Sequence, residues 1–167
     1  VAKRAGAAAP VVGTDGLAGI FDDRQAVLAR DGLDRVHVGG LAEGVHRQLR
    51  PGLPADYATR LCAVFANGGR MAAVVTDDGS VAAVALWRLI ENTYEGRRLY
   101  VDDLVTDEAQ RSRGFGKMLF DWLQAKARQL GCDVIALDSG VQRAGAHKFY
   151  FREGMHIPAY CFRKVIK

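Results

Sequence analysis

The amino-acid sequence predicts an α/β fold with a mixed sheet, on the basis of two observations. The first is a run of three strand-like segments in the middle of the chain, Met71–Thr76, Val81–Ile90 and Arg97–Thr106, separated by turn signals that contain Asp-Gly and Glu-Gly. The second is the alternation of helical and strand-like patterns that follows them. The first observation predicts an antiparallel meander, and the second predicts a βαβ crossover that adds a parallel strand.

The helix that follows the meander has the clearest pattern. Leu119, Leu123, Ala127 and Leu130 recur at helical spacing, and Gly131 is a favourable residue just beyond a helix end. The remaining elements expected after it, in chain order, are a buried strand over Val134–Leu137, a helix over Ala144–Glu153 that Gly154 ends, and a final strand over Ala159–Ile166.

The first third of the chain carries weaker signals. Residues 1–33 should form a partly mobile N-terminal arm, which could contain a short helix over Asp22–Arg30. Beyond the arm we expect, in order, a short strand over Arg35–Val38, a weak helix over Leu41–Leu49, and a better helix that Pro54 opens and Asn67-Gly68-Gly69 ends.

The composition is that of a single globular domain. The chain has 167 residues, of which 49% are hydrophobic and 25% charged. The net charge is +4, but lysine and arginine are spread along the sequence, so we expect no nucleic-acid partner. No apolar run approaches the ~20 residues that cross a bilayer, and the start lacks the pattern of a signal peptide. We therefore expect a cytoplasmic protein with no membrane partner.

The cysteines and histidines do not have the spacing of a metal site. Cys62, Cys132 and Cys161 lie far apart, their number is odd, and no pair has a zinc-ligand spacing. The four histidines show no HxxxH or HExxH pattern. We therefore expect no metal, and we expect each cysteine to behave as a small buried hydrophobe.

The segment from Asp107 to Lys117 has the properties of an anion-binding loop. It joins a strand to an amphipathic helix, whose first turn leaves backbone N–H groups without intrahelical partners. Gly114 and Gly116 allow a ligand to approach the backbone, and neighbouring cations add positive charge. A P-loop is excluded because Lys117 is followed by methionine, and a Rossmann fingerprint is excluded because its third glycine is replaced by Leu119.

Three motifs in order resemble the GCN5-related N-acetyltransferase (GNAT) family. Arg111-x-x-Gly114-x-Gly116 resembles its acetyl-CoA loop, and the acidic strand Tyr100–Thr106 precedes that loop as in the family. The segment Ala146–Met155 resembles the family pattern A-x-x-[FL]-Y-x-x-x-G-F, with methionine in place of the final phenylalanine. The resemblance covers roughly Met71 to Ile166, and we place the corresponding domain at residues 34–167.

The resemblance implies a mixed, mostly antiparallel sheet with helices on both faces and a parallel pair of strands that splay apart at the cofactor site. It implies acetyl-CoA as cosubstrate and no metal. The backbone groups that would bind the pantetheine arm belong to Leu104, Val105 and Thr106. Those that would hold the pyrophosphate belong to Arg111, Ser112, Arg113, Gly114, Phe115, Gly116 and Lys117. Arg143 stands where the family often has asparagine.

The resemblance also suggests which residues move protons. Tyr150 holds the position of the family's general acid, and Asp102 matches a position that some members use as a base. Asp102 and Asp103 should point to opposite faces of their strand, and either could instead pair with Arg97 or Arg98. Asp102 could therefore be the base or an anion that attracts a cationic substrate.

The expected function is transfer of an acetyl group from acetyl-CoA to a primary amine by direct attack, with no covalent enzyme intermediate. The acceptor is unidentified and could be a small molecule, a peptide or a protein; the acidic pair favours a cationic one. A noncatalytic acyl-CoA-binding regulatory module and a nucleic-acid-binding protein are the alternatives. Homodimers are frequent in the family, so a homodimer is compatible with the resemblance.

Overall fold

The computed structural model describes residues 26–28, 56–76 and 80–166. The chain forms two compact units, Val1–Ala136 and Leu137–Lys167, and each is described by itself. The expected strand over Arg35–Val38 and the expected helix over Leu41–Leu49 lie outside the described residues.

Five described strands form one sheet in the order β1 (Ala26–Leu28), β2 (Arg70–Val75), β3 (Val81–Asn92), β4 (Gly96–Thr106) and β5 (Val134–Leu137). The pairs β1–β2, β2–β3 and β3–β4 are antiparallel, which confirms the predicted meander. The helix expected over Asp22–Arg30 is wrong at Ala26–Leu28. These three apolar residues pair with Ala72–Val74, and a segment this short has no periodicity that separates strand from helix.

One extra residue in β4 changes the direction of its side chains. Leu86 pairs with Asp103 and Trp87 pairs with Val101, so Asp102 has no partner residue in β3. This is a β-bulge, which interrupts the strict alternation of side chains between the two faces. Beyond the bulge, Val105 turns its side chain into the core cluster that also holds Val84.

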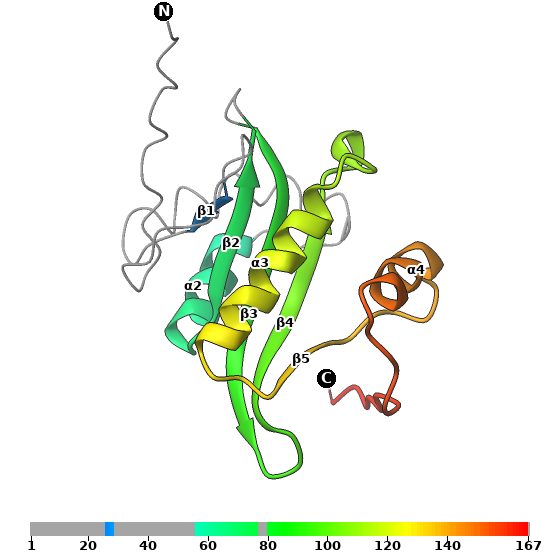
Figure 1. Cartoon of the computed structure of the whole chain (residues 1–167). Coiled ribbons are helices and arrows are strands. Elements are labelled where there is room, and N and C mark those ends of the chain that lie inside the picture. The colour runs from blue at the N-terminus through cyan, green and yellow to red at the C-terminus, as the bar shows by residue number, and fades with distance from the viewer. Residues whose placement is uncertain (1–25, 29–55, 77–79, 167) are drawn as a thin grey trace, which may run out of the picture. The chain divides into compact units, whose positions relative to one another are not determined.

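Two helices cover opposite faces of the sheet. α2 (Tyr57–Ala66) packs Tyr57 and Leu61 on the face that carries Met71, Val84 and Val105. α3 (Phe115–Gln129) packs against β2, β3 and β4, and lies in front of the sheet in Figure 1. The strand residues on its face include fully buried alanines at 72, 83 and 85, whose small side chains let the helix come close.

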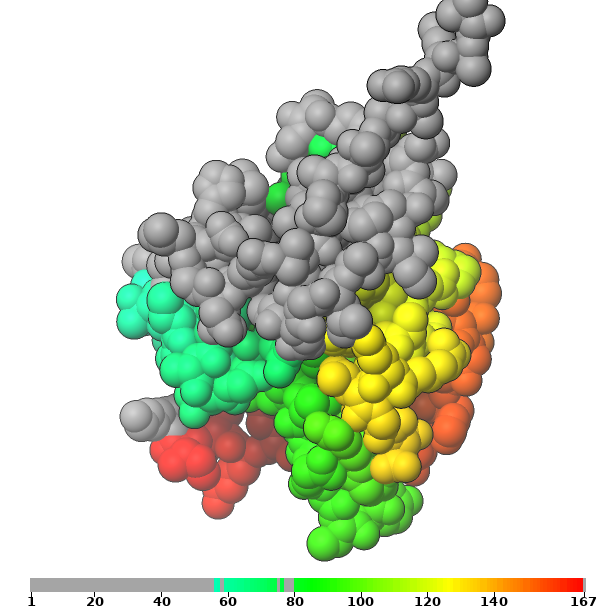
Figure 2. Space-filling model, turned by 60° about the vertical axis from the view of Figure 1, so that its left-hand side comes forward, coloured from blue at the N-terminus to red at the C-terminus, as the bar shows by residue number. Residues whose placement is uncertain are grey.

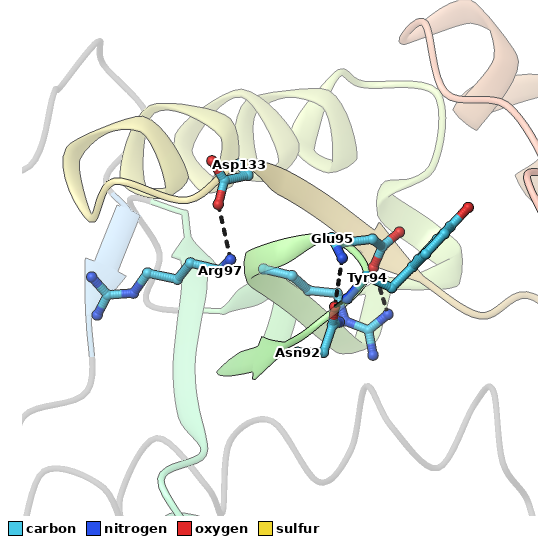
Figure 3. Close-up of polar contacts among 6 residues, drawn as sticks. Asn92, Tyr94, Glu95, Arg97 and Asp133 are labelled. Carbon is cyan, nitrogen blue, oxygen red and sulfur yellow. Dashed lines mark hydrogen bonds and ion pairs between the residues drawn. The ribbon is translucent and has the colours of Figure 1, made fainter.

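The start of β4 is tied to the start of β5. The Asp133 N–H donates to the carbonyl oxygen of Arg97 at 2.7 Å, and the Arg97 N–H donates to Asp133 Oδ2 at 2.9 Å (Figure 3). Since β4 begins at Gly96 and β5 at Val134, the two strands leave this contact side by side and in the same direction. The sheet is therefore mixed, as predicted. Gly96 has φ +73°, and a Cβ on it would meet Asp133 Oδ2 at 2.5 Å, so a larger residue there would be strained and would displace the Asp133 carboxylate.

Local hydrogen bonds close the turns at both ends of this contact. In the β3–β4 turn, Asn92 Oδ1 accepts from the N–H groups of Tyr94 (3.0 Å) and Glu95 (2.6 Å), as Figure 3 shows. This turn projects at the lower edge of the surface in Figure 2, and Tyr94 at its tip is 88% exposed. At the end of α3, Gly131 has φ +66° and the Cys132 N–H donates to the Ala127 carbonyl, which is a Schellman cap.

The second unit contains α4 (Ala144–Arg152), which ends in a Schellman cap at Gly154 (φ +82°), as the sequence predicts. The strand expected over Ala159–Ile166 is wrong, because residues 156–166 form no strand. The segment exposes apolar side chains that alternate along it, among them Tyr160, Phe162 and Ile166. An alternating pattern shows which side chains share a face, but a strand also needs a partner for its backbone groups.

We expect Asp133→Ala to lower the free energy of unfolding by about 1 kcal/mol, because the Arg97 N–H loses its carboxylate acceptor. Asp133→Asn keeps an oxygen at the same position and should lose less. Urea unfolding of the three proteins measures the difference. Equal stability of the alanine variant and the parent protein would contradict a structural role for this contact.

Candidate functional site

The backbone of the glycine loop turns tightly just before the first residue of α3. A short 3₁₀ turn, η1 (Glu108–Gln110), is capped by Asp107, whose Oδ1 accepts from the Ala109 N–H at 2.8 Å. Ser112 has φ +61°, an uncommon value for a residue with a side chain, and Gly114 has φ +87° at the N-cap of α3. The loop thus contains two left-handed residues before the first helical turn.

The first turn of α3 lies directly on the end of β4. A Cβ on Gly116 would meet Thr106 Oγ1 at 3.0 Å, so glycine permits this close packing. Phe115 is buried at 4% exposure and anchors the helix start in the core. Its side chain is therefore not available to a ligand, whereas the backbone N–H groups of the first turn are available because no preceding helical carbonyl reaches them. This arrangement can bind an anion.

The cations of the loop are each engaged by a neighbouring residue. Arg111 Nη1 lies 3.3 Å from Glu108, Lys117 Nζ lies 2.7 Å from Asp121, and Arg113 donates to Gln110 while its guanidinium stacks on the Phe115 ring. Exposed ion pairs of this kind are weak, so the cations can rearrange toward a ligand. The fixed part of the anion site is the backbone.

The peptide groups of β4 that face away from β3 are those of Leu104 and Thr106. The Asp107 N–H donates to the Ala82 carbonyl at 2.9 Å, which fixes the phase of the antiparallel ladder. Alternation from that pair directs the peptide groups of Val105 to Val84 of β3. Of the three strand residues expected to bind pantetheine, Leu104 and Thr106 can therefore offer backbone groups at the β5 edge, whereas Val105 serves the core.

Asp102 is paired with an arginine that the sequence analysis did not consider. Its Oδ2 accepts from Nε of Arg88 at 2.8 Å, and the two side chains are 21% and 31% exposed. The pairings expected with Arg97 and Arg98 are wrong, since these contact Glu91 and Glu95. A signal for Arg88 was present in the sequence, because it is the only charged residue between Val81 and Ile90.

The bulge also changes where the two adjacent aspartates lie. Asp103 pairs with Leu86, which faces the α2 side, and Arg88 is two residues further along the same strand and hence on the same face. Since Asp102 reaches Arg88, both aspartates lie toward the face that α2 covers. The expectation that they point to opposite faces is therefore wrong, because Asp102 is the bulged residue.

Tyr150 belongs to the second unit and lies on α4. Its ring makes an edge contact with Phe149 at 5.5 Å between centroids. Burial raises the pKa of Tyr150 above its ordinary value of 10.0, and the positive charge of Arg143 offsets part of that shift. The hydroxyl therefore keeps its proton at neutral pH, as a proton donor requires.

The cysteines differ from the expectation in part. Cys62 and Cys161 are exposed and Cys132 is half-buried, so the prediction of buried side chains is wrong for the first two. Burial raises the pKa of the Cys132 thiol, with Arg97 opposing the shift, so this thiol is a weak nucleophile at neutral pH.

In the described ranges, no three histidine, cysteine or acidic side chains are grouped as metal ligands would be. None of the helices described there is long and apolar enough to span a bilayer.

Comparison with known proteins identifies the family. The model of the acetyltransferase (GNAT) family matches residues 43–155, more than half of the chain. The chain belongs to this family. An uncharacterized N-acetyltransferase, YhdJ of Bacillus subtilis, is 43% identical over 74 residues, which are 44% of this chain and 52% of that protein. Aminoalkylphosphonate N-acetyltransferase of Salmonella typhimurium is 32% identical over 66 residues, 40% of this chain and 43% of that protein. The matches thus span about half the length of these relatives.

Solved structures of GNAT proteins share the fold. AAC(6')-Iy, in complex with the bisubstrate analogue CoA-S-monomethyl-acetylneamine, superposes with a TM-score of 0.72 over 86% of this chain and 98% of its own, at 15% identity. A putative acetyltransferase from Agrobacterium tumefaciens superposes with a TM-score of 0.69 over 86% and 99%, at 20% identity. The predicted fold class is confirmed.

We expect Gly114→Asp to abolish binding of acetyl-CoA, because a carboxylate at the start of α3 would repel the pyrophosphate by about 4 kcal/mol at a separation of about 4 Å. Gly114→Asn is the matched control, since asparagine has the same shape, no charge, and tolerance of a positive φ. It should retain most of the affinity. Calorimetric titration measures both, and undiminished affinity of the aspartate variant would overturn the loop assignment.

Proposed function

We propose that this protein is an acetyl-CoA-dependent N-acetyltransferase that acetylates a primary amine by direct attack. The observation that carries the proposal is the loop from Arg111 to Lys117, in which Gly114 adopts φ +87° and Gly116 packs on Thr106 at the start of α3. Membership of the GNAT family supports acetyl-CoA as the ligand of this anion site. The domain would extend from residue 34 to residue 167, and β1 (Ala26–Leu28), which precedes it, adds a strand to its sheet.

The residues of the loop have the hydrogen-bond donors and the positive charge that the cofactor's phosphate groups require. The backbone N–H groups from Arg111 to Lys117 would hold the pyrophosphate, and the peptide groups of Leu104 and Thr106 would pair with the pantetheine arm. This binding would need no metal, because N–H donors and cations are themselves ligands for phosphate groups. Acetyl-CoA supplies an acetyl thioester, whose carbon–sulfur bond breaks as the amine nitrogen forms its bond to the acetyl carbon.

Two side chains would move the protons. An amine that arrives as an ammonium must lose a proton, and Asp102 Oδ1 is the carboxylate oxygen not engaged by Arg88. The Tyr150 hydroxyl would donate a proton to the departing sulfur. Its raised pKa keeps it protonated but makes it a weaker acid, so the proton would move as negative charge develops on the sulfur. A water molecule could relay the proton to Asp102, because a carboxylate is a weak base for an ammonium ion.

The acceptor class and the assembly are further parts of the proposal. The name of the Salmonella relative describes an enzyme for a small amine, which favours a small-molecule acceptor over a protein. We propose a cytoplasmic enzyme without nucleic-acid or membrane partners, and a homodimer as its assembly. Large apolar side chains exposed in the second unit, among them Val141, Phe151 and Phe162, favour association with another surface.

The second candidate is a noncatalytic acyl-CoA-binding regulatory module. Calorimetric titration with acetyl-CoA, with ATP and NAD as controls, tests the part that both share. Micromolar binding of acetyl-CoA alone supports the loop, and thiol release with a panel of amines then distinguishes the enzyme from the module. No binding of acetyl-CoA would overturn both candidates.

We expect Tyr150→Phe to lower kcat by roughly 10²–10⁴-fold, the usual contribution of a positioned proton donor, and to change the Kd of acetyl-CoA little. Phenylalanine keeps the ring that contacts Phe149, so packing is preserved. Thiol release and calorimetric titration measure the two quantities. Equal losses in turnover and in affinity would show a structural role for Tyr150 instead.

A further inference from the structure

Arg88 has unused hydrogen-bonding capacity beside Asp102. Nε of Arg88 donates to Asp102 Oδ2, and in the part of the chain that the structure describes its terminal Nη groups make no other polar contact. The side chain is 31% exposed, so these donors can reach a ligand. An arginine held in place through Nε therefore presents the outer edge of its guanidinium.

The geometry of this edge suits an oxyanion. A guanidinium is planar, permanently charged and able to donate two parallel hydrogen bonds to a carboxylate, phosphonate or phosphate group. The bond to Asp102 fixes the plane of the guanidinium before a ligand arrives, which lowers the entropy lost on binding. On the other side of the pair, Asp102 Oδ1 has no partner among the described residues and can accept from an ammonium group.

The surrounding charges do not favour a purely cationic ligand. On the same face of the sheet, Arg98 Nη1 lies 2.9 Å from Glu95, and its guanidinium lies over the Tyr100 ring. With the Arg88–Asp102 pair and Asp103, this face carries two arginines and three carboxylates, and each arginine is paired with one carboxylate. The expectation that the acidic pair selects a cationic acceptor is thereby weakened, because Asp102 is compensated by Arg88.

We propose that the acceptor is a small primary amine that also carries an anionic group, such as a carboxylate or phosphonate, a short carbon spacer away from the nitrogen. Arg88 binds the anionic group through its Nη atoms, and Asp102 receives the ammonium beside it. This inference rests on the proposed N-acetyltransferase function. Arg88 is then a specificity-determining residue, and removing it should affect anionic acceptors more than others.

The test uses the full chain and matched amines. β-Alanine and 2-aminoethylphosphonate carry the anion, n-propylamine has no second charge, and putrescine carries a second cation. Thiol release gives kcat and KM for the parent protein and for Arg88→Met, Arg88→Lys and Arg98→Met. The lysine variant keeps the charge but lacks the planar fork, and the Arg98 variant removes the other arginine of the same face. Thermal unfolding checks that each variant folds.

We expect the parent protein to prefer the anionic amines in kcat/KM. Arg88→Met should reduce this preference by about 10- to 100-fold, the loss expected for charged hydrogen bonds, chiefly through KM. Arg88→Lys should restore part of it, and Arg98→Met should preserve it. If Arg88→Met fails to fold, the lysine variant and the preference of the parent protein still decide the question.

Two results of the kinetic comparison would overturn the inference. One is a parent protein that uses propylamine or putrescine as well as the anionic amines, and the other is an equal loss in Arg88→Met for every amine. Acetyl-CoA binding without turnover of either anionic amine would also reject this acceptor class while leaving the cofactor site in place. Absence of acetyl-CoA binding would instead reject the proposed function itself.

Discussion

The β-bulge at Asp102 is the constraint on which the candidate site depends. Because one residue of β4 has no counterpart in β3, the side chains on either side of it are out of phase. Val101 before the bulge therefore lies on the α3 side, paired with Trp87, and Val105 after it lies in the cluster under α2. The same step leaves Asp103 on the face where Asp102 meets Arg88. In a regular strand, Asp103 would have pointed to the other face.

The positions of the loop and of the parallel strand follow from the ends of β4. Its first residues are held against the start of β5 by the two hydrogen bonds between Arg97 and Asp133. Its last residue, Thr106, lies so close to Gly116 in the first turn of α3 that a Cβ there would be 3.0 Å from Thr106 Oγ1. β4 therefore determines where β5 lies and where α3 begins. It also sets the direction in which the peptide groups of Leu104 and Thr106 point.

Elements with strong local signals could be predicted from the sequence. The period of Leu119, Leu123 and Ala127 defines α3, and the glycine spacing defines the loop, because both depend on neighbouring residues only. The bulge could not be predicted, since a bulge is a mismatch in length between two paired strands. The strand at Ala26–Leu28 and the missing strand at Ala159–Ile166 depend on a partner, which a local pattern does not reveal.

Tyr150, the proposed proton donor, lies in a unit that cannot be stable by itself. None of the described residues from Leu137 to Ile166 is fully buried, and a unit of this size without a core, disulfide or metal does not pay its folding entropy. Its order must come from surfaces outside it. The proton donor Tyr150 would then be positioned by whatever that unit packs on, whereas the anion loop and the Arg88–Asp102 pair are fixed by the sheet. The proposed cofactor loop and the proposed proton donor therefore lie in different units, and we expect mutations in one to leave the other intact.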